Sequence, residues 1–101
     1  MKIKELLIDE SKWIKGKYAT MNDGEGCSIF HDKATCFCLD GAITKCYPPS
    51  QRNNIYQKIV NELNPGIINH IAFSDGAIIA WNDAPERNFN DIKNLIEKLD
   101  I

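Results

Sequence analysis

Four cysteines and a histidine in the first half of the sequence are the residues best suited to metal or thiol chemistry. They are Cys27, His31, Cys36, Cys38 and Cys46. Their spacing, C-x3-H-x4-C-x-C, lacks the paired C-x2-C turns with which zinc fingers and ribbons hold the ion. On a single helix, Cys36 and Cys38 would point about 200° apart and could not share a metal. We expect no metal, no other cofactor and no disulfide, and interpret the thiols as small buried side chains.

A catalytic cysteine is the second hypothesis for these residues. A nucleophilic thiolate needs a neighbouring histidine or lysine and partial exposure to solvent. His31 precedes Cys38 by seven residues, which puts both on one face of any helix long enough to include them. The opposing interpretation is that Cys38 lies in the apolar face of the helix and is inert. We favour a protein that is not an enzyme, and keep a thiol-dependent hydrolase using Cys38 or Cys27 as the alternative.

The most specific string has an aromatic residue, two polar residues, a proline and an arginine: Trp81-Asn82-Asp83-Ala84-Pro85-Glu86-Arg87-Asn88. In one interpretation it is an anchor: Trp81 is buried, Asn82 or Asp83 ties the turn, and Arg87 pairs with an acid such as Asp83. In the other, Asn82, Asp83 and Arg87, beside Trp81, bind a small ligand or a group of a partner through charge-assisted hydrogen bonds. Both interpretations stay open, and these four residues are the candidate binding site.

Apolar residues recur at helical spacing in four segments, and these predict the elements that must position the candidate residues. The second, third and fourth segments follow residues that can cap a helix, namely Asp32, Ser50 and Asn88, the last in a capping box with Asp91. The predicted helices run from residue 3 to near Trp13, from about 33 to 46, from Ser50 to 63, and from Asn88 to the C-terminus.

The second predicted helix has most of its apolar residues on one half, while Lys33, Asp40 and Thr44 share the polar half. On its flank, Phe37 and Gly41 form a shallow notch. Glycine inside a helix is about 1 kcal/mol less favourable than alanine, so Gly41 needs a compensating reason. We expect another backbone to approach it closely.

Two segments carry signals for extended structure and turns. Residues 22–26, Asn-Asp-Gly-Glu-Gly, predict a turn between short extended pieces. Asp75-Gly76, flanked by the apolar residues 71–73 and 77–79, predicts a β-hairpin of two short strands.

Length and composition set the broad class. The 101 residues, 44% of them hydrophobic and 26% charged, suit one domain over residues 1–101. We predict a mainly helical α+β fold, with about four short helices in one compact domain and a minor β-hairpin. The net charge of −2, with scattered lysines, provides no basic stripe for nucleic acid. Without a span of roughly 20 apolar residues or a secretory signal, we expect a cytoplasmic protein that does not bind membranes.

The chain resembles an uncharacterised family of small bacterial and phage-associated proteins with a Cys-Leu-x-Gly-Ala helix and a Trp-Asn-Asp-x-Pro-x-Arg loop. The resemblance rests on four strings that cover nearly the whole chain in order: Trp13-x-x-Gly16-x-Tyr18-Ala19, Asp23-Gly24, Cys38-Leu39-Asp40-Gly41-Ala42, and Trp81-Asn82-Asp83-Ala84-Pro85 with Arg87. It implies a shared fold more than a shared activity, because no reaction is assigned to the family.

The functional hypothesis that best fits these features is a non-enzymatic protein that binds a protein partner, and the resemblance adds a phage-associated factor acting on a host protein. The alternatives are the thiol-dependent hydrolase and a domain that captures a small ligand at the Trp81–Arg87 loop. The exposure of the cysteine thiols distinguishes a reactive cysteine, as the hydrolase needs, from cysteines that are packed in the core. Ligand-dependent thermal shifts test the small-ligand alternative.

Overall fold

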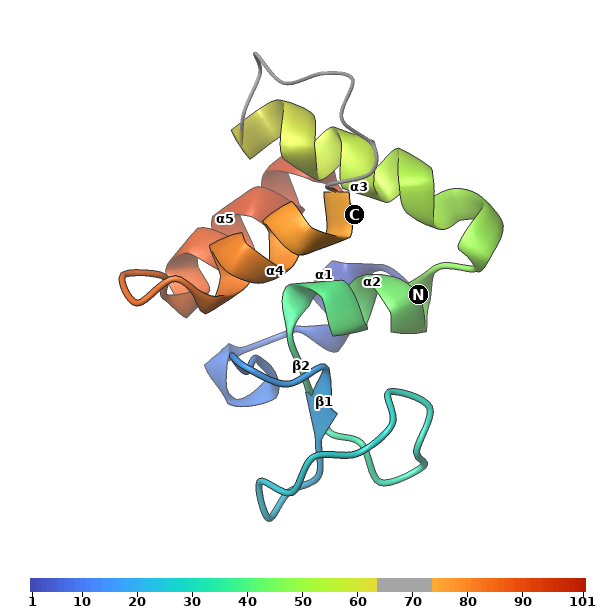
Figure 1. Ribbon diagram of the computed structural model, residues 1–101, viewed down its shortest axis with the longest axis vertical. Helices are drawn as coiled ribbons and strands as arrows, with labels where there is room; N and C mark the ends of the chain where they lie inside the picture. Colours follow the sequence, from blue (N-terminus) through green and yellow to red (C-terminus); the bar gives the residue numbers. More distant parts are fainter. Residues whose placement is uncertain (64–73) are drawn as a thin grey trace.

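Helices form most of the computed structural model, which describes residues 1–63 and 74–101 (Figure 1). The helices are α1 (Ile3–Leu6), α2 (Leu39–Cys46), α3 (Pro49–Leu63), α4 (Ser74–Asp83) and α5 (Phe89–Leu99), with a 3₁₀ turn, η1, at Glu10–Lys12. The strands β1 (Ala19–Thr20) and β2 (Cys36–Phe37) pair antiparallel. The predicted mainly helical α+β class is therefore confirmed. None of the described helices is long and apolar enough to cross a membrane.

The core is built from isoleucine and leucine side chains supplied by every helix. Helix α4 lies between α3 and α2, and α5 contacts α1 and α3 (Figure 1). Burying each such side chain contributes roughly 1.5–3 kcal/mol. The large apolar side chains with the least exposure are Ile3, Leu7, Leu39, Ile43, Ile59, Ile78, Ile92, Ile96 and Ile101.

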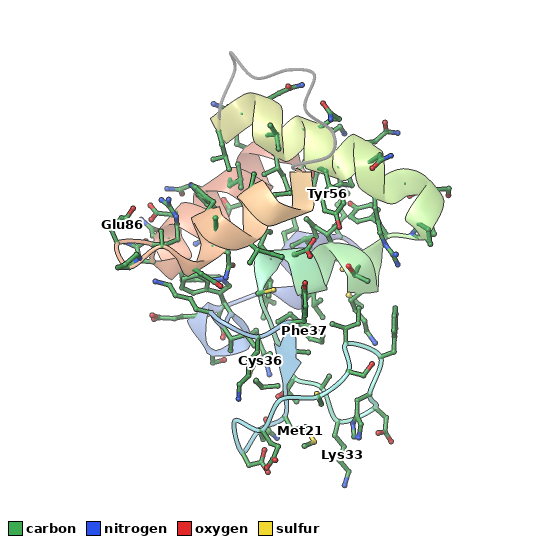
Figure 2. The ribbon with its side chains drawn as sticks, in the orientation of Figure 1. Met21, Lys33, Cys36, Phe37, Tyr56 and Glu86 are labelled. Atoms are coloured by element: carbon green, nitrogen blue, oxygen red, sulfur yellow. The ribbon has the colours of Figure 1, made fainter. Side chains whose placement is uncertain are left out.

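Residues 21–35, which we call the projecting loop, connect the two strands and extend away from the helices (Figure 1). The strand register pairs Ala19 with Phe37 and Thr20 with Cys36. The predicted turn is present: Gly24 has a φ of +85° and its backbone N–H donates to the Met21 carbonyl at 2.9 Å. Met21 and Lys33 mark the outer part of this loop in Figure 2.

The first helix is much shorter than predicted. Helix α1 ends at Leu6, and the Asp9 side chain accepts a hydrogen bond from the Ser11 backbone N–H, which begins η1. Trp13 follows in extended conformation and forms a bridge with Phe37 of β2. A local cap and the tertiary pairing of Trp13 thus override the helical pattern of the sequence.

The second helix begins six residues later than predicted, at Leu39 rather than Lys33. Its cap is Cys38, whose Sγ accepts a hydrogen bond from the Gly41 backbone N–H at 3.2 Å, whereas Asp32 lies exposed in the projecting loop. Cys36 therefore belongs to β2, and the two cysteines do not share a helix. The predicted notch between Gly41 and a helical Phe37 is also wrong, because Phe37 is a buried strand residue.

The close approach predicted at Gly41 is confirmed. A Cβ atom built on Gly41 would overlap the carbonyl oxygen of Tyr18. The same carbonyl accepts a hydrogen bond from the Cys38 backbone N–H at 3.2 Å, which holds the segment before β1 against the start of α2. Glycine at this position is therefore required by packing.

The predicted hairpin is wrong in its second half, because Asp75, Gly76 and residues 77–79 belong to helix α4. The other half, residues 71–73, lies outside the described residues. Short apolar runs do not separate a strand from a buried helix, and Ile78 is fully buried here as a helical residue. The third helix also starts one residue before its predicted cap, so Ser50 lies inside α3 and Pro49 takes the first helical position.

Helix α5 is confirmed with its predicted start. The Asn88 side chain accepts from the Asp91 backbone N–H at 3.0 Å, and the Asn88 backbone N–H donates to the Asp91 carboxylate at 3.2 Å. This reciprocal pair is a capping box, the local signal read from the sequence.

Candidate functional site

Asn82, in the last turn of α4, is fully buried and connects three parts of the chain. Its Oδ1 accepts hydrogen bonds from the Trp13 indole Nε1 at 2.7 Å and from the Leu39 backbone N–H at 3.0 Å. Its Nδ2 donates to the Ile14 carbonyl at 3.1 Å and to Asp83 Oδ1 at 2.8 Å. A side-chain amide has two acceptor and two donor positions, so these contacts satisfy all four.

Asp83, also in the last turn of α4, is partly buried and continues this network. Its Oδ1 accepts from the Gly16 backbone N–H at 3.1 Å as well as from Asn82. One residue further on, the Ala84 carbonyl accepts from Lys15 Nζ at 2.7 Å. Residues 14–16 are therefore fastened to the end of α4 by both side-chain and backbone groups.

Arg87 pairs with an acid, as predicted, but that acid is Asp91 and not Asp83. Its guanidinium lies 4.1 Å from the centroid of the Trp81 ring, and its Nε donates to the Trp81 carbonyl at 2.8 Å. The Arg87 guanidinium lies 3.5 Å from the carboxylate of Asp91, in the first turn of α5. Trp81 is half-buried, with Arg87 covering one face of its ring. In this loop, Arg87 links the end of α4 to the start of α5.

The structure does not assemble the candidate thiol–imidazole pair. Cys38 is 4% exposed, and burial raises the pKa of its thiol, although the Gly41 N–H opposes that shift. Burial also raises the pKa of the Cys46 thiol. His31 is exposed in the projecting loop, where its Nδ1 accepts from the Lys33 backbone N–H at 3.0 Å. No hydrogen bond within the described residues joins His31 to Cys38.

All four cysteines are free thiols in separate environments. The Sγ of Cys36 donates to the Ser11 carbonyl at 3.1 Å, and Cys27 is half-buried at the base of the projecting loop. Over residues 1–63 and 74–101, no three histidine, cysteine or acidic side chains are grouped closely enough to hold a metal ion.

A cleft that the sequence did not predict lies where the base of the projecting loop meets α2 and α3. Its volume is about 380 Å³, and Asp40 is its one acidic residue among those described, so we call it the Asp40 cleft. Its lining consists of Tyr18, Cys27, Ser28, Ile29, Asp40, Thr44 and Tyr56.

Asp40 is 5% exposed, although the sequence placed it on the polar half of its helix. The Tyr56 hydroxyl, which reaches from α3 toward α2 (Figure 2), donates to Asp40 Oδ1 at 2.8 Å. Asp40 also lies in the first turn of α2, where the helix dipole stabilises a negative charge. The sequence could have indicated this environment of Asp40 only if the start of α2 had been predicted correctly. A helix that begins at Leu39 places Asp40 in its first turn, whereas a helix that begins at Lys33 places it in the middle.

Comparison with known proteins identifies the family of the chain, and that family has no established function. A family model matches residues 2–99, and its description is a family of unknown function, DUF6197. No curated protein and no solved structure matches the chain. The match confirms the prediction of an uncharacterised family, and it leaves the role of the residues above to be inferred from their chemistry.

Proposed function

Because the chain belongs to DUF6197, a family of unknown function, we propose its role from its own surface: it is a non-enzymatic binding protein whose ligand is another protein. The phage association implied by the sequence resemblance would make that partner a host protein. The observation that carries the proposal is the exposure of large aromatic side chains on and beside the projecting loop.

Phe30 and Tyr18 are 62% and 54% exposed. Aromatic side chains are enriched at the centres of protein interfaces, because they bury a large area at little cost in conformational entropy. The ammonium group of Lys45, in α2, lies 5.6 Å from the centroid of the Phe30 ring, and this cation–π contact helps to hold the ring in place. Tyr18 and Ile29 both line the Asp40 cleft, so the aromatic surface continues into a concave one.

The state of the thiols argues against the hydrolase alternative. A buried thiol with a raised pKa is protonated at neutral pH and is a poor nucleophile, which describes Cys38. Cys27 is better exposed, but the described lining of its cleft includes no histidine or lysine that could activate it. We place the protein in the cytoplasm, where four free thiols remain reduced.

The test compares two substitutions of equally exposed apolar residues at different places. Phe30→Ser changes the projecting loop, and Ile8→Ser changes a residue that is 67% exposed and lies beyond the end of α1. Tagged wild-type protein captures partners from a bacterial lysate, and the affinity of each captured protein is then measured by titration calorimetry. We expect Phe30→Ser to weaken binding by about tenfold or more, as for an interface anchor, and Ile8→Ser to leave it unchanged.

Two results would contradict the proposal. One is a captured partner that binds Phe30→Ser as tightly as wild type, which would remove the projecting loop from the interface. The other is equal weakening by both substitutions, which would indicate non-specific adhesion of apolar surface. Unchanged melting temperatures of both variants are the control for folding.

A second candidate function is the binding of a small ligand beside the Trp81–Arg87 loop. It is supported by a smaller cleft, of about 130 Å³, in which Asp83 is the acidic residue and Lys17 the basic one. Charges of both signs in one cleft suit a small polar ligand bound by directional hydrogen bonds. On this proposal Asp83 contacts the ligand, Asn82 and Trp81 hold the loop in place, and Arg87, which covers Trp81, is not among the described residues that line the cleft.

A further inference from the structure

We propose that the protein partner adds an extended segment with basic side chains to the open edge of the small sheet, at Gly26 of the projecting loop. This inference rests on the proposed function, because Gly26 and Phe30 lie in the same loop, which extends away from the helices (Figure 1). It states how the partner is held. The support comes from the hydrogen bonds of the sheet, the exposure of Gly26 and the charges beside it.

The sheet extends beyond its two strands. Thr20 of β1 forms an antiparallel bridge with Gly26, and Phe37 of β2 forms a parallel bridge with Trp13. The order across the sheet is therefore the segment at Gly26, then β1, then β2, then the segment at Trp13. Gly26 and Trp13 mark its two edges.

The edge at Trp13 is covered by the end of helix α4. The buried Asn82 side chain accepts from the Trp13 indole at 2.7 Å and donates to the Ile14 carbonyl at 3.1 Å. A further strand could reach the Ile14 carbonyl only by displacing Asn82. This edge is thus protected, as the edges of natural sheets commonly are.

At the other edge, the backbone of Gly26 points away from the sheet. On either side of its bridge, the Cys27 N–H donates to the Ala19 carbonyl at 3.1 Å and the Met21 N–H donates to the Glu25 carbonyl at 2.9 Å. In an antiparallel ladder, this pattern directs both the N–H and the carbonyl of the intervening residue outward. Gly26 is exposed, and neither of these groups has a hydrogen-bond partner among the described residues. One donor and one acceptor on the same edge are what an added extended backbone pairs with.

The charges beside this edge indicate which segment fits it. Asp23 and Glu25 are exposed, and in the part of the chain that the structure describes neither carboxylate forms an ion pair. The Lys17 ammonium donates to the Gly24 carbonyl at 3.4 Å, so these two carboxylates and one ammonium leave a net negative charge. Opposite charges on neighbouring strands stabilise their pairing and like charges oppose it. Lysine or arginine side chains in the added segment therefore fit better than acidic ones.

The test uses three short peptides. The first is acetyl-Lys-Thr-Val-Thr-Lys-amide, the second is the same peptide N-methylated at its three central residues, and the third has glutamate in place of both lysines. Binding to the wild-type protein is followed by NMR at the Gly26 amide. With the first peptide we expect a saturable shift of this amide proton and slower exchange with deuterium. We expect at least about tenfold weaker binding of the other two peptides, because one lacks the N–H donors and the other carries like charges.

Two substitutions at one position test the same edge from the side of the protein. Gly26→Pro removes the N–H, and we expect it to weaken the lysine peptide by about tenfold or more in titration calorimetry. Gly26→Ala is the matched control, because it keeps the N–H and its methyl group meets the Lys17 side chain at an ordinary distance of 3.5 Å. We expect its affinity to stay within about twofold of wild type. If Gly26→Pro does not fold, the comparison of the peptides on wild-type protein still decides.

Equal binding of the plain and N-methylated peptides, or an unchanged Gly26 amide, would overturn the inference. Equal binding of the lysine and glutamate peptides would overturn its basic character. Self-association of the protein that Gly26→Pro abolishes and Gly26→Ala does not would show that a second copy occupies the edge, which also overturns the assignment to a partner.

These failures differ from failure of the proposed function. A partner that requires Phe30 but binds Gly26→Pro as tightly as Gly26→Ala supports the binding function and refutes pairing at the edge. Peptide binding that depends on the Gly26 N–H, without any partner that requires Phe30, supports the edge and refutes the aromatic interface.

Discussion

The Trp13 indole donates a hydrogen bond to Asn82 at 2.7 Å, across 69 positions of the sequence. This bond links the segment after η1 to the last turn of α4, and the same Asn82 oxygen accepts from the first residue of α2. A buried amide with all its hydrogen bonds satisfied specifies a single arrangement of its neighbours. The Trp13–Asn82 pair therefore fixes how residues 13 and 14 lie against the end of α4 and the start of α2.

Replacing Asn82 by alanine is expected to destabilise the protein by about 3–5 kcal/mol. The truncation leaves the Trp13 indole, the Leu39 N–H and the Ile14 carbonyl without their partner, and each unsatisfied buried group costs about 1–3 kcal/mol. Equilibrium denaturation in urea measures the change. Asn90→Ala, at an exposed position of α5, is the control and should change stability by less than about 0.5 kcal/mol. A loss of under about 1 kcal/mol for Asn82→Ala would show that water replaces the missing bonds.

Replacing Gly41 by alanine is expected to lower the melting temperature, although alanine favours helix by about 1 kcal/mol. The added methyl group overlaps the Tyr18 carbonyl, and relieving the overlap requires a backbone shift that costs about 1–3 kcal/mol. Gly76→Ala, in α4, is the matched substitution, because a Cβ there meets no atom of residues 1–63 and 74–101 within 4 Å. It should raise the melting temperature. If both substitutions stabilise the protein, the close approach at Gly41 is not a constraint.

Cys38 is expected to react slowly with thiol reagents at neutral pH. Its raised pKa keeps the thiol protonated there, so the labelling rate should continue to rise with pH beyond the ordinary thiol pKa of 9.0 instead of reaching a plateau below it. Labelling kinetics of a variant that retains only Cys38, measured between neutral and alkaline pH, provide the test. A variant that retains only the half-buried Cys27 is the comparison and should label faster at every pH. Rapid labelling of Cys38 at neutral pH would favour the hydrolase instead.

Acid is expected to destabilise the contact between the two ends of the described chain. Lys2 and Lys4 lie 2.8 and 2.5 Å from the Asp100 carboxylate and lower its pKa from 3.8 to about 2. A carboxylate with a lowered folded-state pKa stabilises the fold above pH 3.8, and this contribution is lost as the pH falls from 3.8 toward 2.

Melting temperatures of wild type and Asp100→Asn across that pH range test this expectation. The difference between the two proteins should shrink as the pH falls, and added salt should reduce it because all three groups are exposed. A difference that is independent of pH would show that the carboxylate contributes through something other than its charge.

Elements with a local signal could be predicted from the sequence, and elements set by distant contacts could not. Helix α5 begins at a capping box whose two members are three residues apart, so its start is visible in the sequence. The start of α2 depends on a cysteine as its cap. The sequence alone does not show whether a cysteine caps a helix or lies inside one. The Asp40 cleft was missed for the same reason, because a helix begun at residue 33 puts Asp40 on its polar half. Helix α4 packs against both α3 and α2, so apolar residues lie on several of its sides. The sequence of this segment therefore lacks the one-sided apolar pattern that indicates a helix.

The loop candidates were identified correctly as a group, but their partners were not. Asn82 and Asp83 bond to residues 13–16, which no local rule connects to them. Arg87 was expected to pair with an acid such as Asp83; it pairs instead with Asp91 and covers the Trp81 ring. Sequence distance conceals these contacts, since an asparagine that caps a nearby turn and one that fastens a distant segment have the same local surroundings.

The substitution Asp83→Ala distinguishes the anchor from the ligand site. As an anchor, Asp83 holds the Gly16 N–H and the Asn82 amide, so its removal should lower stability by about 1–3 kcal/mol, and any binding should weaken only as far as folding does. As part of a site for a small ligand, Asp83 should matter more for binding than for stability, because groups that converge on a ligand often add little to the stability of the free protein. We expect the anchor result. The measurement pairs the melting temperature with the ligand-dependent shift of that temperature in a screen of small polar molecules. A variant as stable as wild type that has lost such a shift would instead place a ligand site at the end of α4.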